Sequence, residues 1–139
     1  RQMCIRDRDM TRALLAEEGY EDKFGGSMHQ QTAVQYELEM LEAELEAARL
    51  LVYKSAWMMD NKMPNSKEAS MGKAKAGRIG NRISLKCVEI CSMQGFSEEH
   101  LLEKFSRDSK ILDIFEGTQQ IQQLIVARQV LNKSSSDLK

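Results

Sequence analysis

The chain has 139 residues, about the length of one domain, and its 20 basic and 21 acidic residues give a net charge of −1. No basic block with interleaved aromatic residues occurs, which argues against nucleic-acid binding. No apolar run approaches the roughly 18 residues of a membrane span, and no apolar signal segment begins the chain. We therefore expect no contact with a membrane, and a location in the cytoplasm or, in a eukaryote, the mitochondrial matrix.

The first eight residues, Arg1–Arg8, lack an initiator methionine and contain three arginines. They resemble the translation of a sequencing-adapter sequence at the truncated end of an assembled gene. We expect residues 1–8 to be a non-native leader of a truncated chain, and we leave them out of the predicted fold.

The rest of the chain contains one proline and is rich in Leu, Ala, Glu, Lys, Met and Gln, which favours an all-α fold. A short helix is predicted over residues 9–19, followed by a loop over residues 20–27. A long helix is predicted from Val34 to about Asn61. Apolar or small residues recur along it at spacings of three and four: Leu38, Leu41, Leu45, Ala48, Val52, Ser55 and Met59.

A second long helix is predicted from the turn at Pro64-Asn65-Ser66 to about Met93. Its predicted inner face is made mostly of small residues, which let two helices approach closely: Ala69, Gly72, Ala76, Gly80, Ile83, Cys87 and Ile90. This composition predicts a central position for the helix in a bundle.

Ser97 is predicted to cap a short helix. Thr118 is predicted to begin the last helix, which runs to about Asn132. Residues 134–139 are predicted to form a polar tail. Residues 9–133 are therefore predicted to fold as an up-and-down four-helix bundle with short extra helices. The three cysteines form no CxxC pair and are expected to be reduced core thiols. A metal-binding bundle would need Glu-x-x-His pairs, and neither His29 nor His100 follows a glutamate at that spacing.

Glu116 stands where the apolar run Ile111–Phe115 meets the predicted last helix. Apolar neighbours such as Ile114 and Phe115 can exclude water from a carboxylate, which makes it a candidate base. An acidic residue before a helix is also an ordinary capping group. Position alone leaves both interpretations open.

The wider segment reads Arg107-Asp108, then Phe115-Glu116-Gly117-Thr118, then Ile121-Gln122. In its residue types and their spacing, this segment resembles the end of the C-terminal helical domain of the acyl-CoA dehydrogenase family. The similarity extends over residues 10 to 133, through these stretches: Phe24-Gly25, Ala33-Val34-Gln35, Ala47-Ala48-Arg49-Leu50-Leu51, Lys73-Ala74-Lys75-Ala76, Gly95-Phe96, Leu102-Glu103-Lys104 and Ile125-Val126-Ala127-Arg128.

The resemblance implies an FAD-dependent oxidation of an acyl-CoA thioester to its trans-2-enoyl form. Glu116 matches the family's base, which removes the α-proton, and its backbone N–H matches a donor to the thioester oxygen. Thr118 and Gln120 match positions that contact the flavin cofactor, as do Phe24 and Gln31 with weaker support. Without the resemblance, Thr118 and Gln120 would be read as an N-cap and a solvated first-turn residue.

Several residues depart from the family pattern. Glu21 stands where an arginine for the FAD diphosphate is common, and a carboxylate there would repel a phosphate. Thr32 and Glu89 each replace a common glutamine, and Ser92-Met93 replaces a Gly-Gly pair. FAD contacts at these places are not carried over.

Members of the family also have an N-terminal helical domain and a middle β-domain, so we expect this chain to be the C-terminal part of a longer enzyme and to be inactive alone. The resemblance implies three partners: an acyl-CoA substrate, an electron-transfer-flavoprotein-type acceptor, and further copies in a homodimer or homotetramer. Two alternatives stay open: a non-catalytic oligomerisation module that uses the stripe from Val34 to Met59, and the equivalent domain of an acyl-CoA oxidase.

Overall fold

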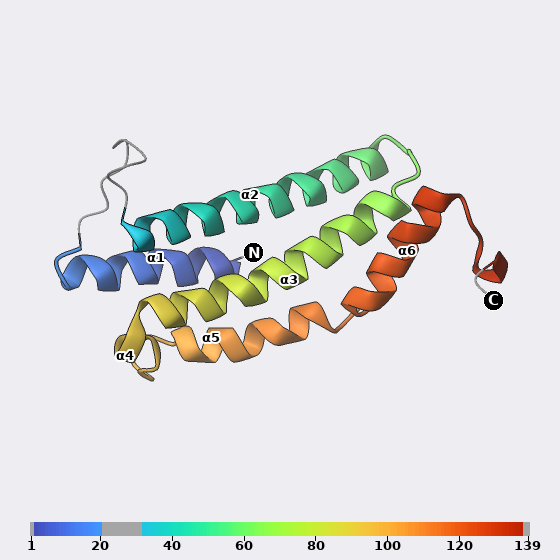
Figure 1. Cartoon of the computed structure of the whole chain (residues 1–139). Coiled ribbons are helices and arrows are strands. Elements are labelled where there is room, and N and C mark those ends of the chain that lie inside the picture. The colour runs from blue at the N-terminus through green and yellow to red at the C-terminus, as the bar shows by residue number, and fades with distance from the viewer. Residues whose placement is uncertain (1, 21–31, 138–139) are drawn as a thin grey trace.

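The computed structural model describes residues 2–20 and 32–137, and these ranges contain helices and no strands. The elements in chain order are α1 (Gln2–Glu17), α2 (Ala33–Asp60), α3 (Ser66–Ile90), α4 (Ser92–Gly95), α5 (Leu102–Ser109), η2 (Lys110–Asp113), α6 (Gln119–Leu131) and η3 (Ser135–Asp137). Helices α1, α2, α3 and α5 lie side by side with alternating direction, and α6 continues beyond α5 toward the other end (Figure 1). The all-α, up-and-down bundle expected from the sequence is confirmed.

Helix α3 is the centre of this bundle, as its small residues predicted. It contacts α1, α2, α4, α5, η2 and α6. The buried core that it shares with its neighbours contains Leu14, Leu41, Leu45, Ile79, Ile83, Cys87, Val88, Cys91 and Leu102. The three cysteines are buried free thiols. None of the described helices combines the length and apolar character needed to cross a membrane.

Helix α1 begins at Gln2, earlier than the predicted start at residue 9. The residues before position 9 complete an amphipathic face, because Cys4 packs into the core and Asp7 is fully buried. The Asp7 carboxylate accepts a hydrogen bond from the Ser84 hydroxyl. Burial raises the pKa of Asp7 to about 6, although the hydrogen bond from Ser84 opposes this shift. The helical start was therefore placed too late, while the non-native origin of residues 1–8 stays a prediction.

The predicted inner face of α2 is correct in its first half and wrong near its end. Leu38, Leu41, Leu45 and Ala48 are buried, but Met59 is 70% exposed and Met58 is buried instead. Helix α1 reaches only about halfway along α2 (Figure 1), so the face that it covers in the first half is open in the second.

The predicted inner face of α3 is wrong in its first turn. Ala69 is exposed there, and Glu68 and Ser70 are buried instead. The buried Glu68 carboxylate lies 3.5 Å from the Lys67 ammonium group, which compensates part of its lost hydration.

Ser97 was expected to cap a helix that begins at residue 98, but α5 begins four positions later, at Leu102. The Ser97 hydroxyl accepts a hydrogen bond from the Glu99 N–H at 3.2 Å, which closes a local turn instead of a helical cap. Leu101 then adopts a left-handed conformation, with φ of 61°, which redirects the chain into α5.

The close approach of η2 to α3 depends on Gly77. A Cβ atom at this position would lie 2.7 Å from the carbonyl oxygen of Leu112 in η2. The two backbones are thus in direct contact, and no side chain at position 77 fits without moving one of them. By contrast, a Cβ atom at Gly72 would meet Val52 Cγ2 at 3.4 Å, an ordinary contact with a side chain.

We predict that Gly77→Ala lowers the free energy of unfolding by about 1–3 kcal/mol, because the new methyl group displaces η2. The matched change Gly72→Ala should be neutral or raise stability by up to about 1 kcal/mol, since alanine favours helix more than glycine does. Urea unfolding followed by circular dichroism measures both. Equal effects in the two variants would contradict the proposed close packing at Gly77.

Candidate active site

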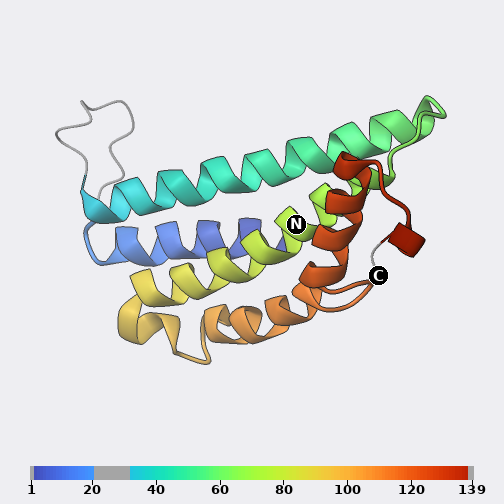
Figure 2. The same ribbon diagram turned by 45° about the vertical axis from the view of Figure 1, so that its right-hand side comes forward.

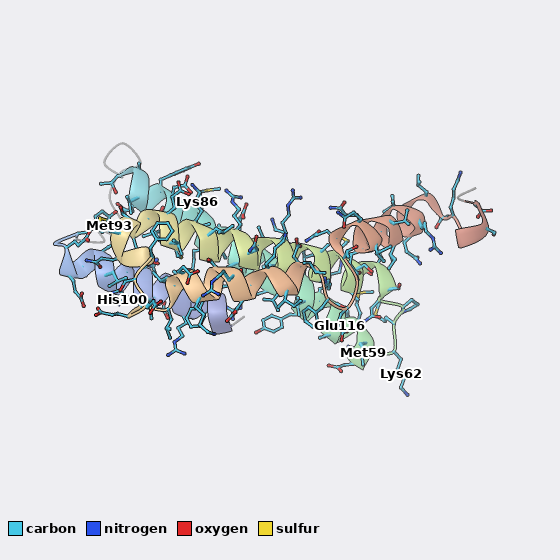
Figure 3. All side chains as sticks on the ribbon, turned by 90° about the horizontal axis from the view of Figure 1, so that it is seen from below. Met59, Lys62, Lys86, Met93, His100 and Glu116 are labelled. Carbon is cyan, nitrogen blue, oxygen red and sulfur yellow. The ribbon has the colours of Figure 1, made fainter. Side chains whose placement is uncertain are left out.

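The connection between η2 and α6, residues 114–118, carries Glu116. It lies at the end of the bundle away from His100 and Met93 (Figure 3). Glu116 and Gly117 both have left-handed backbones, with φ of 56° and 102°, and together they turn the chain from η2 into α6. The φ of Gly117 favours glycine, and a Cβ atom there would also lie 2.5 Å from the side-chain amide nitrogen of Gln122, which would have to move.

Two side chains hold the carbonyl groups of this turn. Gln122 Nε2 donates a hydrogen bond to the Glu116 carbonyl oxygen at 3.2 Å. Lys73 Nζ, from α3, donates to the Gly117 carbonyl oxygen at 2.6 Å. The backbone around Glu116 is therefore fixed both within α6 and against α3.

A third side chain, Gln119, joins the start of α6 to its surroundings. Its Nε2 donates to the Ala74 carbonyl oxygen of α3 and to Asp113 Oδ1 of η2, each at 2.6 Å. Lys110 Nζ lies 3.0 Å from the other carboxylate oxygen of Asp113. Burial alone would raise the pKa of Asp113, but the hydrogen bonds from Gln119 and Lys110, with the positive charges of Lys110 and Lys73, hold it below its ordinary value.

A cavity of about 420 Å³ lies beside this turn, between α2, α3 and η2. Its lining is mainly apolar or small: Cys4, Leu45, Ala48, Val52, Tyr53, Ala76, Gly77, Ile79, Gly80, Leu112 and Phe115, together with Arg49, Lys73 and Glu116. Among the described residues that line it, Glu116 supplies the only carboxylate. Arg49 is held by an ion pair of 2.9 Å with Glu46 and lies over the Tyr53 ring.

Water is less excluded from Glu116 than the sequence suggested. Glu116 is exposed in this chain, and its neighbours Ile114 and Phe115 are each 48% exposed. Phe115 lines the apolar cavity with Glu116, whereas Ile114 lines a different hollow. Among the described residues, none shields Glu116 enough to make it buried or half-buried.

That second hollow, of about 790 Å³, is polar and contains both Thr118 and Gln120. It lies between α3, η2 and the N-terminus of α6. The cations of its lining are Arg78, Arg82, Lys86 and Lys110, and its carboxylates are Glu89 and Asp113. Three of the four cations already form ion pairs with Glu44, Glu89 and Asp113.

Thr118 is the N-cap of α6, but its side chain makes no capping hydrogen bond, and Gln120 is exposed in the first turn. The positive end of the α6 dipole and the surrounding cations form a donor set suited to a diphosphate group. The four cations exceed the two carboxylates of the lining, so the hollow fits the anionic part of a dinucleotide such as FAD, with Glu89 and Asp113 as opposing charges.

The structure does not test every residue that the sequence placed near a flavin or among the departures from the family pattern. Phe24 and Gln31 lie outside the described residues, as does Glu21. Thr32 is the N-cap of α2, where its hydroxyl accepts a hydrogen bond from the Gln35 N–H at 3.1 Å. Met93 is 86% exposed. Of the departures noted in the sequence, Glu89 is the one that the structure brings beside Thr118 and Gln120.

Sequence reasoning gave no role to Lys73, Gln119, Gln122 or Asp113, the residues that fix the Glu116 turn. Lys73 belongs to one of the family-like stretches, but lysines on a long helix are usually solvated, and the motif does not show what its ammonium group contacts. Its partner is 44 positions away in the chain. Only the packing of η2 on α3 brings the two together.

The lowered pKa of Asp113 predicts a pH dependence of stability. Because the folded state lowers this pKa, ionised Asp113 stabilises the fold above its unfolded pKa of about 3.9, and this contribution is lost as the pH falls through the folded pKa. Asp113→Asn should lower the free energy of unfolding at pH 7 by about 1 kcal/mol, and the difference from wild type should shrink below about pH 4. Chemical denaturation between these pH values measures it, with the exposed Glu99→Gln as a control that should follow wild type. A difference that is constant with pH would contradict this role.

Residues 12–131 match the family model described as acyl-CoA dehydrogenase, C-terminal domain. The chain is 39% identical over 111 residues to the caffeyl-CoA reductase-Etf complex subunit CarC of Acetobacterium woodii, covering 80% of this chain and 29% of that protein. It is 36% identical over 113 residues to the mitochondrial short-chain specific acyl-CoA dehydrogenase of Bos taurus, covering 81% of this chain and 27% of that protein.

The solved structure of butyryl-CoA dehydrogenase from Megasphaera elsdenii has the same fold, with a TM-score of 0.71 and 28% identity, over 93% of this chain and 35% of that one. In all three comparisons the chain spans about a third or less of the longer protein. The family model covers most of the chain and includes Glu116, Thr118 and Gln120. The chain belongs to the acyl-CoA dehydrogenase family and corresponds to its C-terminal domain.

Proposed function

We propose that this domain acts within a longer, FAD-dependent enzyme that oxidises an acyl-CoA thioester to its trans-2-enoyl form, and that Glu116 removes the α-proton. The observation that supports this most is the position of Glu116, which supplies the only carboxylate among the described residues that line the apolar cavity between α2, α3 and η2. A carboxylate in an apolar cavity that can admit an acyl chain is the arrangement that this proton transfer requires.

The chemistry explains why the base must be held firmly. A proton next to a thioester carbonyl is weakly acidic, so its removal needs an aligned acceptor and stabilisation of the charge that develops on the carbonyl oxygen. The Glu116 side chain would accept the proton, and its backbone N–H would donate to the thioester oxygen. The hydrogen that leaves the β-carbon is accepted as hydride by FAD when that cofactor is bound.

We propose that the rest of the longer polypeptide excludes water from the Glu116 carboxylate. Glu116 and Phe115 are exposed in this chain, and the chain covers only 27–29% of the two relatives compared above. We propose that the remaining domains close over the cavity. This would put the carboxylate in a less polar environment, where it is a stronger base than in water.

Thr118, Gln120 and the N-terminus of α6 would hold the anionic part of FAD in the polar hollow on the other side of α3. Arg78 would offset part of the negative charge of a diphosphate there, and Arg82, Lys86 and Lys110 would share their charge between the diphosphate and their carboxylate partners. Phe24 and Gln31 stay proposed contacts on the basis of sequence alone.

The proposed partners follow from the relatives. One relative is named as a subunit of an Etf complex, which supports an electron-transfer-flavoprotein-type acceptor for this protein as well. A homodimer or homotetramer is proposed, and the exposed apolar residues of α2, including Trp57 and Met59, are available for such contacts. We propose a cytoplasmic location, or the mitochondrial matrix in a eukaryote. An oxidase of the same family would use the same proton transfer with oxygen as acceptor.

Glu116→Gln in the full-length, flavin-loaded protein tests the proposed base. The substitution keeps the size of the side chain and removes the proton acceptor. We expect kcat to fall by about 100- to 10,000-fold with unchanged flavin content. Turnover with acyl-CoA thioesters and the flavin absorbance spectrum measure the two effects.

Glu98→Gln is the matched control, because Glu98 is exposed in the connection before α5, at the other end of the bundle. This variant should behave as wild type. Near-normal turnover of Glu116→Gln would show that Glu116 is not the base and would favour the non-catalytic interpretation of this turn.

A further inference from the structure

We propose that Lys73 is a positioning residue for the base, and that its ammonium group holds the turn carrying Glu116 in the orientation that proton transfer requires. This inference rests on the proposed function, because it gives Lys73 a role only if Glu116 takes the proton. In this role Lys73 acts through the Gly117 carbonyl group and not on the reacting atoms.

The contact that supports the proposal joins two distant parts of the chain. Lys73 lies in the second turn of α3, and its Nζ donates to the Gly117 carbonyl oxygen at 2.6 Å. The donor is charged and half-buried, which makes such a hydrogen bond stronger than a neutral one on the surface. The acceptor is the residue directly after the base.

The turn needs a support of this kind because of its backbone. Glu116 has φ of 56°, a region that residues other than glycine adopt with strain. The hydrogen bond to the Glu116 carbonyl oxygen comes from Gln122 in α6, the helix that directly follows the turn, so it fixes the local shape of the turn but not its place in the bundle. The bond from Gln119 to Ala74 anchors the first residue of α6, three positions after the base. Among the described contacts, the hydrogen bond from Lys73 is the one that ties the immediate neighbour of Glu116 to α3.

Lys73 also lines the apolar cavity together with Glu116, whereas Lys75 does not. Lys75 is half-buried on the same helix and lines a separate groove beside α6, with Gln123 and Val126. The two lysines are two positions apart on one helix and face different hollows. Lys75 is therefore a matched control for the loss of a helical ammonium group.

A loosened turn would affect the chemical step more than substrate binding. The acyl chain contacts the cavity wall, which Lys73→Met leaves apolar, whereas proton transfer depends on the distance and angle between the carboxylate and the α-carbon. The inference therefore predicts a change in kcat with little change in KM, flavin content or Tm.

The experiment uses the full-length, flavin-loaded protein and three variants. Lys73→Met should lower kcat about 10- to 100-fold, as expected for a base displaced by a fraction of an ångström to an ångström. Lys75→Met should keep wild-type kcat. Lys73→Arg should recover most of the lost turnover, because a guanidinium group can donate to the same carbonyl. Amide hydrogen exchange of residues 114–118 should be faster in Lys73→Met than in Lys75→Met.

The double variant Lys73→Met/Glu116→Gln separates this inference from the proposed function. If Lys73 acts through Glu116, the double variant should be no slower than Glu116→Gln alone. If the loss of kcat in the double variant equals the product of the losses in the two single variants, Lys73 acts on the reaction independently, and this would overturn the inference. So would a loss of Tm and flavin content that parallels the loss of turnover in Lys73→Met, since Lys73 would then be structural.

The single variants distinguish a failure of the proposed base from a failure of the role proposed for Lys73. A nearly inactive Glu116→Gln beside a fully active Lys73→Met would overturn only the role of Lys73. A fully active Glu116→Gln would overturn the proposed base and, with it, the inference that depends on it.

Discussion

The contact between the backbones of α3 and η2 at Gly77 is the constraint on which the candidate site depends. A Cβ atom there would reach within 2.7 Å of the Leu112 carbonyl oxygen, so η2 lies on α3 only because position 77 has no side chain. One turn earlier on α3, Lys73 and the Ala74 carbonyl are then within hydrogen-bonding distance of Gly117 and Gln119. The packing of two helices thus sets the place of the turn that carries Glu116.

The same turn separates two different environments. On one side, Glu116 and Phe115 line an apolar cavity, and on the other, Thr118 and Gln120 line a polar hollow with four cations. Helix α6 leaves the turn at a steep angle to α5 (Figure 2). The first residues of α6 line the polar hollow. The proposed function uses this difference, with an apolar acyl chain on one side of the segment and an anionic dinucleotide on the other.

Most of the fold could be predicted from residue patterns. The two long helices follow from helix-favouring residues with regular apolar spacing, and the central place of α3 follows from its small residues. The apolar spacing and the capping residues gave wrong predictions where packing against neighbouring helices decides which residues are buried and where a helix begins. Met59 matches the apolar spacing of α2 but is exposed, since α1 does not extend along that half of α2. Ser97 has the chemistry of a helix cap but bonds within a turn, and α5 begins at Leu102.

The sequence by itself determined the all-α bundle, the family and the position of Glu116 before the last helix, because these depend on local propensity and on a motif that is continuous along the chain. Only the tertiary structure decided which groups hold the motif in place. The hydrogen bonds from Lys73 to Gly117 and from Gln119 to Ala74 join residues 44 and 45 positions apart. Such contacts depend on how two helices pack, and no periodicity within either helix specifies them.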